Sequence, residues 1–416
     1  MKFFIETIGC QMNVNDSDEM AKYLLSCGYE KTDNYLEADV IILNTCSVRF
    51  SAEHKAYSFL GRLKEYKETK SDVIIGVAGC MAQYAYKEIK KKCPFVDFVI
   101  GAKNIQSFKE IINKFIKSQQ IKNKTIKKEL FKFITIARGC SNFCTYCIVP
   151  FVRGPEISID SEEIYLQAKE AVDNGTKEIT LLGQNVNSYN FNGTNFTQLI
   201  QKVSAIENLQ RIRFMTNHPK DLSDELIDEI ASNGKVCKHI HLPLQSASNR
   251  ILKLMNRKYT YEQYRDLVFK IKNKIPDINI TSDIIIGFPT ETEEDFQETF
   301  NAAKELQFGG LFIFKYSPRP KTFALQLKDD VSLETKQNRL SILLEESNII
   351  SKNINCNYIG KSVDVLVESF QNNICCGRNS QNLKIFFPSK EDLTGKEVNV
   401  TIDTALANSL SGKMIL

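Results

Sequence analysis

The chain has 416 residues, too many for one hydrophobic core, so its length predicts two or three domains. Hydrophobic residues make up 43% and charged residues 25%, which is typical of a soluble globular protein. The sequence has no run of about 18 apolar residues that could cross a bilayer, and Glu6 comes too early for a secretory signal. We therefore expect a cytoplasmic protein without membrane contact.

Cysteine and lysine are the residue types whose placement is most informative. Twelve cysteines in a reducing compartment favour metal or cluster ligation over disulfides. The net charge of +4 is too small to indicate a nucleic-acid partner, but lysines concentrate in residues 103–132, above all in residues 122–128. Such a segment would attract an RNA backbone, although a solvated linker between domains explains the same lysines.

Residues 1–120 alternate short apolar runs with amphipathic patterns. This alternation predicts a parallel, doubly wound sheet covered by helices. The predicted strands are residues 3–5, 39–43, 72–78 and 96–100, and the predicted helices are residues 16–27, 52–67, 80–92 and 105–116.

Three cysteines of this region, Cys10, Cys46 and Cys80, each follow a different predicted strand. The carboxyl ends of parallel strands lie along one edge of a sheet, where such sheets bind ligands. We therefore predict that the three thiolates converge and hold an iron-sulfur cluster. Cys27 and Cys93 follow no such pattern and are interpreted as small buried hydrophobic residues.

A second set, Cys140, Cys144 and Cys147, forms a C-x3-C-x2-C array after a predicted strand at residues 131–136. Three thiolates on a cubane cluster leave one iron open, and an open iron can bind a small chelating molecule. The alternatives are a structural zinc site or three unrelated buried thiols. Zinc needs a fourth ligand close by, and the four histidines lie outside the array, at His54, His218, His239 and His241.

The region from residue 125 to residue 355 continues the alternation, with six strand-helix units in all. Six such units predict a partial (β/α) barrel whose active site lies at the carboxyl ends of the strands. The further strands are expected at residues 177–182, 211–215, 239–244, 278–286 and 310–316, and the helices at residues 161–174, 196–206, 222–232, 261–274 and 293–306.

Polar and glycine-containing segments follow these strands. Glycine lets a cofactor approach the backbone, and amide side chains can bond a cofactor or a base edge. Turn formation and barrel packing alone would not favour Gln184, Asn185, Gln245 and Asp283 together. The predicted cofactor-binding residues of these segments are Gly183, Gln184, Asn185, Gln245, Ser246 and Asp283. For His218, His239 and His241 we expect ordinary packing or hydrogen bonding.

The last 60 residues or so change to an alternating β-type pattern, with strands expected at residues 362–367, 383–387 and 397–402. Short strands separated by turns predict a small barrel related to the OB fold. Positive charge is sparse there, at Lys361, Arg378, Lys384 and Lys396. A plain packing role is expected for three further cysteines, Cys356, Cys375 and Cys376.

The cysteine loop, with Tyr146 beside its last cysteine, resembles that of the radical S-adenosylmethionine (SAM) enzymes. Gly-Cys-Gln-Met-Asn at residues 9–13, Asn-Thr-Cys-Ser-Val-Arg at residues 44–49 and Gly79-Cys80 resemble the amino-terminal domain of the methylthiotransferases. The first of these motifs and Gly-Gln-Asn-Val-Asn-Ser-Tyr at residues 183–189 are similar to the tRNA-modifying branch. The carboxyl-terminal segment resembles a TRAM domain, an RNA-binding module, through Gly360-Lys361, Gly377-Arg378 and residues 409–412.

The resemblance implies three domains, at residues 1–120, 125–355 and 357–416. It implies two 4Fe-4S clusters, one on each cysteine set, facing each other across a domain boundary, with SAM bound at the second set and Tyr146 beside it. The implied reaction is 2-methylthiolation of N6-dimethylallyladenosine in the anticodon loop of tRNA. An adenine C2–H does not react with ordinary bases, so the reaction needs a radical. A flavodoxin-type or ferredoxin-type reductant would supply electrons.

The sequence also departs from the family pattern. The Arg-Gly-x-Glu-x-Ser-Arg loop lacks its last arginine, which is Ile159 here, and Ala247, Thr290 and Lys321 stand where glycine is usual. One alternative keeps the chemistry and changes the substrate to threonylcarbamoyladenosine in tRNA or to a ribosomal-protein aspartate. An alternative from another class is a non-catalytic protein that binds zinc and RNA.

Overall fold

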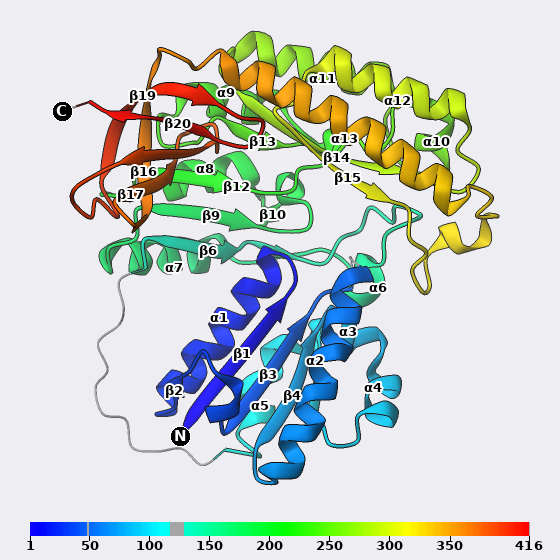
Figure 1. Cartoon of the computed structure of the whole chain (residues 1–416), viewed down its shortest axis with the longest axis vertical. Coiled ribbons are helices and arrows are strands. Elements are labelled where there is room, and N and C mark those ends of the chain that lie inside the picture. The colour runs from blue at the N-terminus through cyan, green and yellow to red at the C-terminus, as the bar shows by residue number, and fades with distance from the viewer. Residues whose placement is uncertain (48–49, 117–128, 416) are drawn as a thin grey trace.

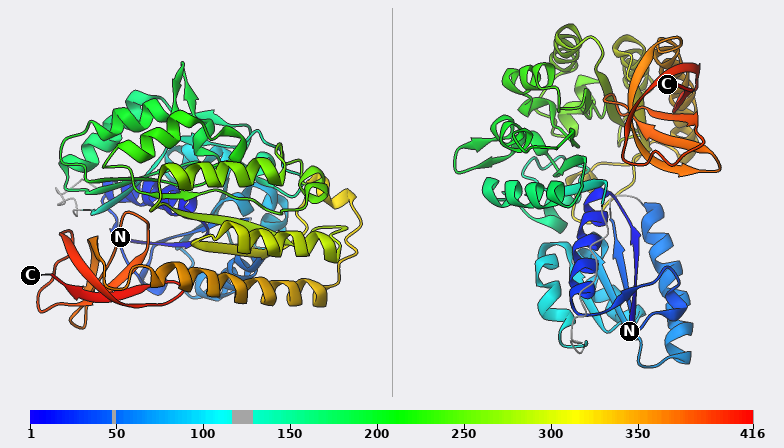
Figure 2. Two further views of the ribbon diagram at one scale, coloured as in Figure 1. Left: turned by 90° about the horizontal axis from the view of Figure 1, so that it is seen from above. Right: turned by 90° about the vertical axis from the view of Figure 1, so that its left-hand side faces the viewer.

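The structure is a computed structural model, which describes residues 1–47, 50–116 and 129–415. The lysine-rich residues 122–128 lie outside the described residues. An amino-terminal sheet lies beneath a central open barrel, and a small carboxyl-terminal barrel covers one end of that central barrel (Figures 1 and 2). None of the described helices is long and apolar enough to cross a membrane.

The amino-terminal sheet has five parallel strands in the order β2-β1-β3-β4-β5. The chain reverses its direction of winding between β1 and β3, so helices cover both faces. This confirms the doubly wound sheet and makes β1/β3 its switch point. The strands are β1 (Lys2–Ile8), β2 (Glu30–Lys31), β3 (Val40–Thr45), β4 (Ile74–Gly79) and β5 (Phe98–Gly101), and the helices are α1 (Gln11–Ser26), α2 (Phe50–Thr69), α3 (Cys80–Tyr84), α4 (Tyr86–Lys92) and α5 (Phe108–Ile112).

Three predicted helix boundaries in this region were wrong. Helix α1 begins at Gln11 and not at residue 16, because its first turns bury polar side chains such as Asn13 and Asp16, which hide the hydrophobic periodicity. The helix predicted at residues 80–92 is two helices that meet at Ala85. Residues 105–116 form only the short α5 after a 3-10 segment, Ala102–Ser107.

The central region is an open barrel of six parallel strands in sequential order, in two hydrogen-bonded triplets connected by the bridge between Ile212 and Val236. Its helices lie outside the strands and bury the largest apolar cluster of the protein. The partial barrel is therefore confirmed. The strands are β6 (Phe131–Thr135), β9 (Glu178–Leu182), β12 (Arg211–Phe214), β13 (His239–His241), β14 (Asn279–Ile286) and β15 (Gly310–Lys315), and the outer helices are α7 (Ser161–Asp173), α8 (Phe196–Ser204), α9 (Asp224–Ser232), α10 (Asn249–Leu254), α11 (Tyr261–Lys274) and α12 (Glu293–Leu306).

Strand β13 is shorter than predicted. Residues 242–244 leave the ladder after His241, and Gln245 pairs with Ile284 only through an isolated bridge. Gln245 has a φ of +75°, which a continuous strand does not allow.

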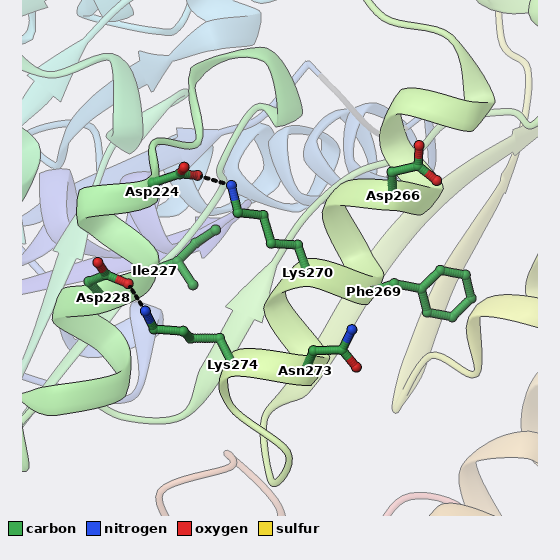
Figure 3. A pocket seen from close by; sticks show the side chains of 8 residues that line it. All are labelled: Asp224, Ile227, Asp228, Asp266, Phe269, Lys270, Asn273 and Lys274. Atoms are coloured by element: carbon green, nitrogen blue, oxygen red, sulfur yellow. Dashed lines mark hydrogen bonds and ion pairs between the residues drawn. The ribbon is translucent and has the colours of Figure 1, made fainter.

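On the outer surface of this barrel, α9 and α11 enclose an open groove (Figure 3). Lys270 pairs with Asp224, and Lys274 pairs with Asp228 at 2.6 Å. These pairs connect one helix to the other, so the groove is a packing seam whose charges neutralise one another.

A long helix, α13 (Leu333–Cys356), connects β15 to the carboxyl-terminal region and was not predicted. The region itself is a closed barrel, as expected, in the order β16-β17-β18-β20-β19. Two of its strands, β17 and β20, were not predicted from the pattern. They contain Gly377-Arg378 and most of residues 409–412, which carry the resemblance to a TRAM domain. The strands are β16 (Ser362–Gln371), β17 (Ile374–Arg378), β18 (Lys384–Pro388), β19 (Glu397–Ala405) and β20 (Leu410–Met414).

Of the three cysteines near and in this barrel, Cys375 is fully buried in the barrel core, as predicted, and Cys376 is partly exposed. Cys356 is exposed at the end of α13, so a packing role is wrong for that residue.

The small barrel rests on the amino ends of the central strands. Arg211, at the start of β12, donates to Asp364 at 2.6 Å and to Glu397 at 2.5 Å. Arg213 donates to the carbonyl of Asn379 at 2.8 Å. The carboxyl-terminal barrel therefore lies at the end of the central barrel opposite to the carboxyl ends of its strands.

Candidate functional site

The first cysteine set converges at the carboxyl edge of the amino-terminal sheet. Cys10 follows β1 and caps α1, Cys46 follows β3, and Cys80 follows β4 as the first residue of α3. The thiols of Cys10 and Cys46 are hydrogen-bonded, and the charge of Cys10 acts on Cys80. The three cysteines thus follow neighbouring strand ends at the edge where doubly wound sheets bind ligands, and their role as ligands of one cluster stays a prediction.

A buried amide pair fixes the first two strand ends. Asn13 accepts from the backbone N–H of Cys10 at 3.3 Å and donates to Asn44 Oδ1 at 3.0 Å. Asn44 donates in turn to the hydroxyl of Ser17 at 2.9 Å. Buried polar groups that bond one another in this way hold a single geometry, so this pair holds the ends of β1 and β3 in register beneath the thiols.

Gly79 allows Cys80 to approach the end of β3. Its φ is +98°, and a Cβ at this position would lie 2.4 Å from the carbonyl oxygen of Thr45. Only glycine fits such a position. The tight turn brings Cys80 directly beside the end of β3.

A buried ion network connects this edge to the central barrel. Asp16 on α1 accepts from Arg138 at 2.8 Å and pairs with Arg153 Nη2 at 3.5 Å, and the Asp16 side chain is only 1% exposed. Arg153 also hydrogen-bonds the thiol of Cys80. Two arginines beside the second cysteine loop thus pair with one carboxylate of the amino-terminal region.

Arg153 favours negative charge on the first cysteine set. The pKa of the Cys10 thiol is lowered to about 6, first by the hydrogen bond from Cys46 and then, against burial, by the charge of Arg153. Burial raises the pKa of Cys80, and Arg153 opposes that rise. Burial also works against the charge on Arg153, but Cys80 and Asp16 hold its pKa above the ordinary value. Thiolates are the forms that ligate metal.

The second cysteine set lies on one loop after β6. Cys147 donates its backbone N–H to the carbonyl of Cys144 at 2.9 Å, and Cys140 donates to the carbonyl of Gly154 at 3.1 Å. Burial, followed by the neighbouring Cys144, raises the pKa of Cys147 to about 12. The Sγ of Cys144 accepts from Arg257 Nη1 at 3.5 Å. This loop brings its thiols together by local turns.

The two sets are neighbours across the boundary between the regions. Cys80 packs in one small buried cluster with Ile148 and Val152, and Ile148 directly follows Cys147. Helix α3, which starts at Cys80, thus lies against α6 (Val149–Arg153), which follows the second cysteine loop. Cys80 of the amino-terminal set therefore lies against the central region, next to the second cysteine loop.

The spacing of these groups does not fit a single zinc ion. Among the described residues, no three His, Cys, Asp or Glu side chains lie close enough to hold one ion. A single zinc ion needs its sulfur ligands at about 2.3 Å. A cubane spreads its thiolates over separate irons, so its ligands lie farther apart than those of a single zinc ion.

Four of the predicted cofactor-binding residues have structural partners. Gln184 accepts from the backbone N–H of Gly139 at 2.6 Å and so holds the second cysteine loop. Ser246 contacts the hydroxyl of Thr299 at 3.3 Å. Gly183 lies against Val186, and Tyr146 is partly buried against the apolar cluster around Phe288. Their roles toward a cofactor stay predictions.

The other predicted residues present polar atoms at the strand ends. Asn185 donates to Asp221 at 2.7 Å, but its Oδ1 is buried without a partner in the described structure, as is Oε1 of Gln245. Asn217, which sequence reasoning missed, has the same property at Oδ1. Asp283 lies 3.5 Å from His241 Nε2. Buried acceptors without donors are costly, so this cluster fits a ligand that brings N–H groups.

The histidines of the barrel are hydrogen-bonded, as expected. His239 and His241 contact the same hydroxyl, Oγ1 of Thr281, at 3.1 and 3.0 Å. Nδ1 of His218 accepts from the backbone of Lys220, and burial followed by the charge of Arg257 lowers the pKa of His218 to about 2. His218 is therefore a neutral part of the barrel wall.

Asp16, Arg138, Arg153 and Arg257 are charged site residues to which the sequence assigned no role. Arg153 begins the Arg-Gly-x-Glu-x-Ser-Arg loop that was compared with the family pattern, yet Arg153 and Asp16 meet only after the chain has folded. Arg257 has no recognisable signal in the sequence. Its guanidinium bonds the carbonyl of Pro243 at 2.9 Å as well as Cys144, and so connects the cysteine loop to the end of β13.

Comparison with known families matches all three regions. Residues 2–101 match the Uncharacterized protein family UPF0004, residues 134–303 the Radical SAM superfamily, and residues 357–415 the TRAM domain.

Solved structures agree on the fold. The radical S-adenosylmethionine methyltransferase TsrM from Kitasatospora setae, with cobalamin and a [4Fe-4S] cluster bound, aligns with a TM-score of 0.56 at 12% identity and covers 78% of this chain and 73% of its own. The cobalamin-dependent enzyme OxsB aligns with a TM-score of 0.52 at 13% identity, over 83% of this chain and 56% of its own. These likenesses show the fold, and the match of residues 134–303 to the Radical SAM superfamily defines the class as a radical SAM enzyme.

Full-length relatives identify the family more closely. A protein of Endomicrobium trichonymphae is 50% identical over all of both chains, and one of Alkaliphilus oremlandii is 45% identical over all of this chain and 93% of its own. An Acetivibrio thermocellus protein is 45% identical over 99% of this chain and 91% of its own. Each is named tRNA-2-methylthio-N(6)-dimethylallyladenosine synthase, and this chain belongs to that family.

Proposed function

We propose that this protein converts N6-dimethylallyladenosine beside the anticodon of tRNA to its 2-methylthio derivative, using two SAM molecules and two 4Fe-4S clusters. The observation that carries the proposal is the position of the Cys10, Cys46 and Cys80 set against the Cys140, Cys144 and Cys147 loop. A radical enzyme that only cleaves SAM needs the second set alone. A first set beside it adds a second centre, from which sulfur can be delivered.

Each cysteine set would hold one cluster through three thiolates. When bound, the two clusters and SAM supply a radical able to take the C2 hydrogen of adenine and a methylated sulfur to replace it. Arg153 stabilises negative charge at the first set, and Arg257 does so at Cys144. Asp16 holds the two regions together, so that both centres meet one substrate position.

The buried acceptors at the strand ends support a site for SAM and the base. Asn185, Asn217 and Gln245 offer carbonyl oxygens to N–H donors, which both the SAM amino group and adenine possess. Asp283 adds a partly exposed carboxylate. The target base must leave its stack to reach this depth, which is easiest in a single-stranded loop.

Phosphate binding belongs in this proposal to the carboxyl-terminal barrel and the lysine-rich segment. The barrel lies at the amino ends of the central strands, so a bound tRNA would extend along the molecule from there to the cysteine loop. Replacing Lys384 and Lys396 by alanine should weaken binding, and each lost contact should reduce the salt slope of log K by roughly 0.7. Affinity indifferent to both salt and these changes would exclude this role.

We also propose a cytoplasmic location and a flavodoxin-type or ferredoxin-type reductant, because low-potential electrons are needed to cleave SAM. Residues 1–120, 125–355 and 357–416 are proposed as the three domains. The residue span between the first two coincides with the lysine-rich segment.

Mass spectrometry of tRNA nucleosides from a strain that lacks the gene tests the function. The expected result is loss of the methylthio group from the dimethylallyl base, restored by the intact gene and not by a Cys46→Ala copy. An unchanged amount of the 2-methylthio derivative of the dimethylallyl base, with loss of a methylthio group from threonylcarbamoyladenosine or from a ribosomal protein, would instead support the substrate alternatives.

A further inference from the structure

Large apolar side chains are exposed around the second cysteine loop. Phe143, Phe323 and Leu325 are 44%, 51% and 48% exposed. Phe151 lies between the two phenylalanines, with ring centroids 6.5 Å from Phe143 and 6.3 Å from Phe323. The four side chains, here called the aromatic patch, come from the cysteine loop, α6 and a 3-10 turn, Phe323–Gln326. Contiguous exposed apolar surface usually marks an interaction site.

The backbone beneath the patch is held firmly. Phe143 has a φ of +49°, which is unfavourable for a bulky residue and directs its ring outward. The Asn256 side chain donates to the carbonyl of Phe143 at 3.0 Å, and Ala324 donates its N–H to the carbonyl of Thr145 at 2.9 Å. The patch is therefore a preformed surface that includes the cysteine loop itself.

The cysteine loop exposes Phe143 and buries the next residue, Cys144. Phe143 precedes Cys144, whose Sγ contacts Arg257, and Arg257 continues to the carbonyl of Pro243 at a strand end. An electron that enters at Phe143 thus has one residue to cross before it reaches a proposed cluster ligand. Because electron transfer slows steeply with distance, a donor protein must dock close to the cluster.

Three exposed lysines border the segments that form the patch. Lys258 donates to the Asn256 side chain at 2.6 Å, next to Phe143, and Lys321 lies two residues before Phe323. Lys103 of the amino-terminal region approaches Gly154 at the end of α6. An apolar centre with a cationic rim complements an apolar surface with an acidic rim.

We infer that the aromatic patch and its lysine rim dock the electron donor, a small acidic protein that carries a flavin or an iron-sulfur cluster. This rests on the proposed function and names the surface on which its reductant acts. Single-stranded RNA also stacks on aromatic rings, but the substrate base has to reach Asn185, Asn217 and Gln245 at the strand ends. Those residues line the interior and not the patch.

The test uses the reconstituted full-length protein, purified flavodoxin and the double variant Lys258→Glu/Lys321→Glu. Formation of 5′-deoxyadenosine is driven either by reduced flavodoxin or by dithionite, and flavodoxin binding is measured by calorimetry. We expect about a tenfold weaker Kd and a correspondingly higher KM for flavodoxin, with the dithionite-driven rate unchanged. Phe323→Ser should weaken binding without altering its salt dependence.

The matched control is Lys270→Glu/Lys274→Glu in the groove of Figure 3, which should leave flavodoxin binding unchanged. Unaltered flavodoxin affinity in both patch variants would overturn the proposal. So would unaltered donor binding together with weakened binding of the anticodon stem-loop RNA, which would assign the patch to RNA. Absence of methylthiolation by the wild-type protein with dithionite would contradict the proposed function and leave the binding result to decide on the patch.

Discussion

The two cysteine sets are assembled by different means. Cys140, Cys144 and Cys147 lie on one loop, so their proximity is a local property of the chain. Cys10, Cys46 and Cys80 come from three strand ends, and the sheet topology brings them together. The first kind of site is visible as a motif, whereas the second depends on a folded domain and on its contact with the barrel.

The electrostatic surroundings of the two sets differ as well. The pKa of Cys10 is lowered to about 6 by Cys46 and Arg153, whereas burial and Cys144 raise the pKa of Cys147 to about 12. Cys10 of the assembled set is therefore prepared to form a thiolate, first by its hydrogen bond with Cys46 and then by Arg153 from another region, whereas burial raises the pKa of Cys80. At Cys147 of the loop set, the thiolate needs the metal itself to become stable.

The largest difference between the roles of the two cysteine sets should appear when one cysteine is removed from each. Cys144→Ala should abolish both 5′-deoxyadenosine formation and methylthiolation, because the set proposed to hold the SAM-binding cluster is lost. Cys46→Ala should abolish methylthiolation and retain reductive cleavage of SAM. Chromatography of the nucleoside products and of 5′-deoxyadenosine measures both. Cys375→Ala is the control, and loss of both reactions in Cys46→Ala would show that the sets do not act separately.

Alkylation rates in the cluster-free protein should show the difference between the thiol pKa of Cys10 and that of Cys147. A lowered pKa means that Cys10 gains its thiolate as the pH rises through about 6, so at pH 7 it reacts quickly with iodoacetamide, whereas Cys147 stays protonated and almost inert. Peptide mass spectrometry from pH 5 to 9 gives the rates. Arg153→Gln should move the Cys10 profile to higher pH, and equal rates at both cysteines would refute the contrast.

The ion network between the regions should have a large effect on stability. Asp16→Asn leaves the buried Arg153 and the partly buried Arg138 without their carboxylate, which should cost about 3 kcal/mol of unfolding free energy in urea. Asp266→Asn removes an exposed carboxylate paired with Arg265 and should change stability by less than about 1 kcal/mol. Similar effects in both variants would mean that Asp16 does not hold the regions together.

The contact between the carboxyl-terminal barrel and the central barrel should contribute less to stability than the Asp16 network. Arg211 is buried, but its partners Asp364 and Glu397 are about half exposed. Water can therefore replace much of the hydrogen bonding that these carboxylates lose with Arg211. Arg211→Gln should therefore cost about 1 kcal/mol, measured by the same urea unfolding. A loss as large as that of Asp16→Asn would show that the two interfaces are equally tight.

Periodicity and cysteine placement predicted most of the architecture. Strand ends followed by Cys10, Cys46 and Cys80 predicted the convergent edge, because in a parallel sheet position along the strand determines position in space. Polar first turns hid the start of α1, and the short strands β17 and β20 carry too little alternation to be recognised. Arg153 and Asn217 could not be assigned, since their partners are distant in sequence and only packing brings them together.

Iron counting tests the central claim, that each cysteine set holds its own cluster, most directly. Wild-type protein reconstituted without oxygen should contain about eight irons per chain. Replacing Cys10, Cys46 and Cys80 together by alanine should leave about four irons, and so should replacing Cys140, Cys144 and Cys147. Loss of all iron on removing either set, or about four irons in the intact protein, would contradict two separate clusters.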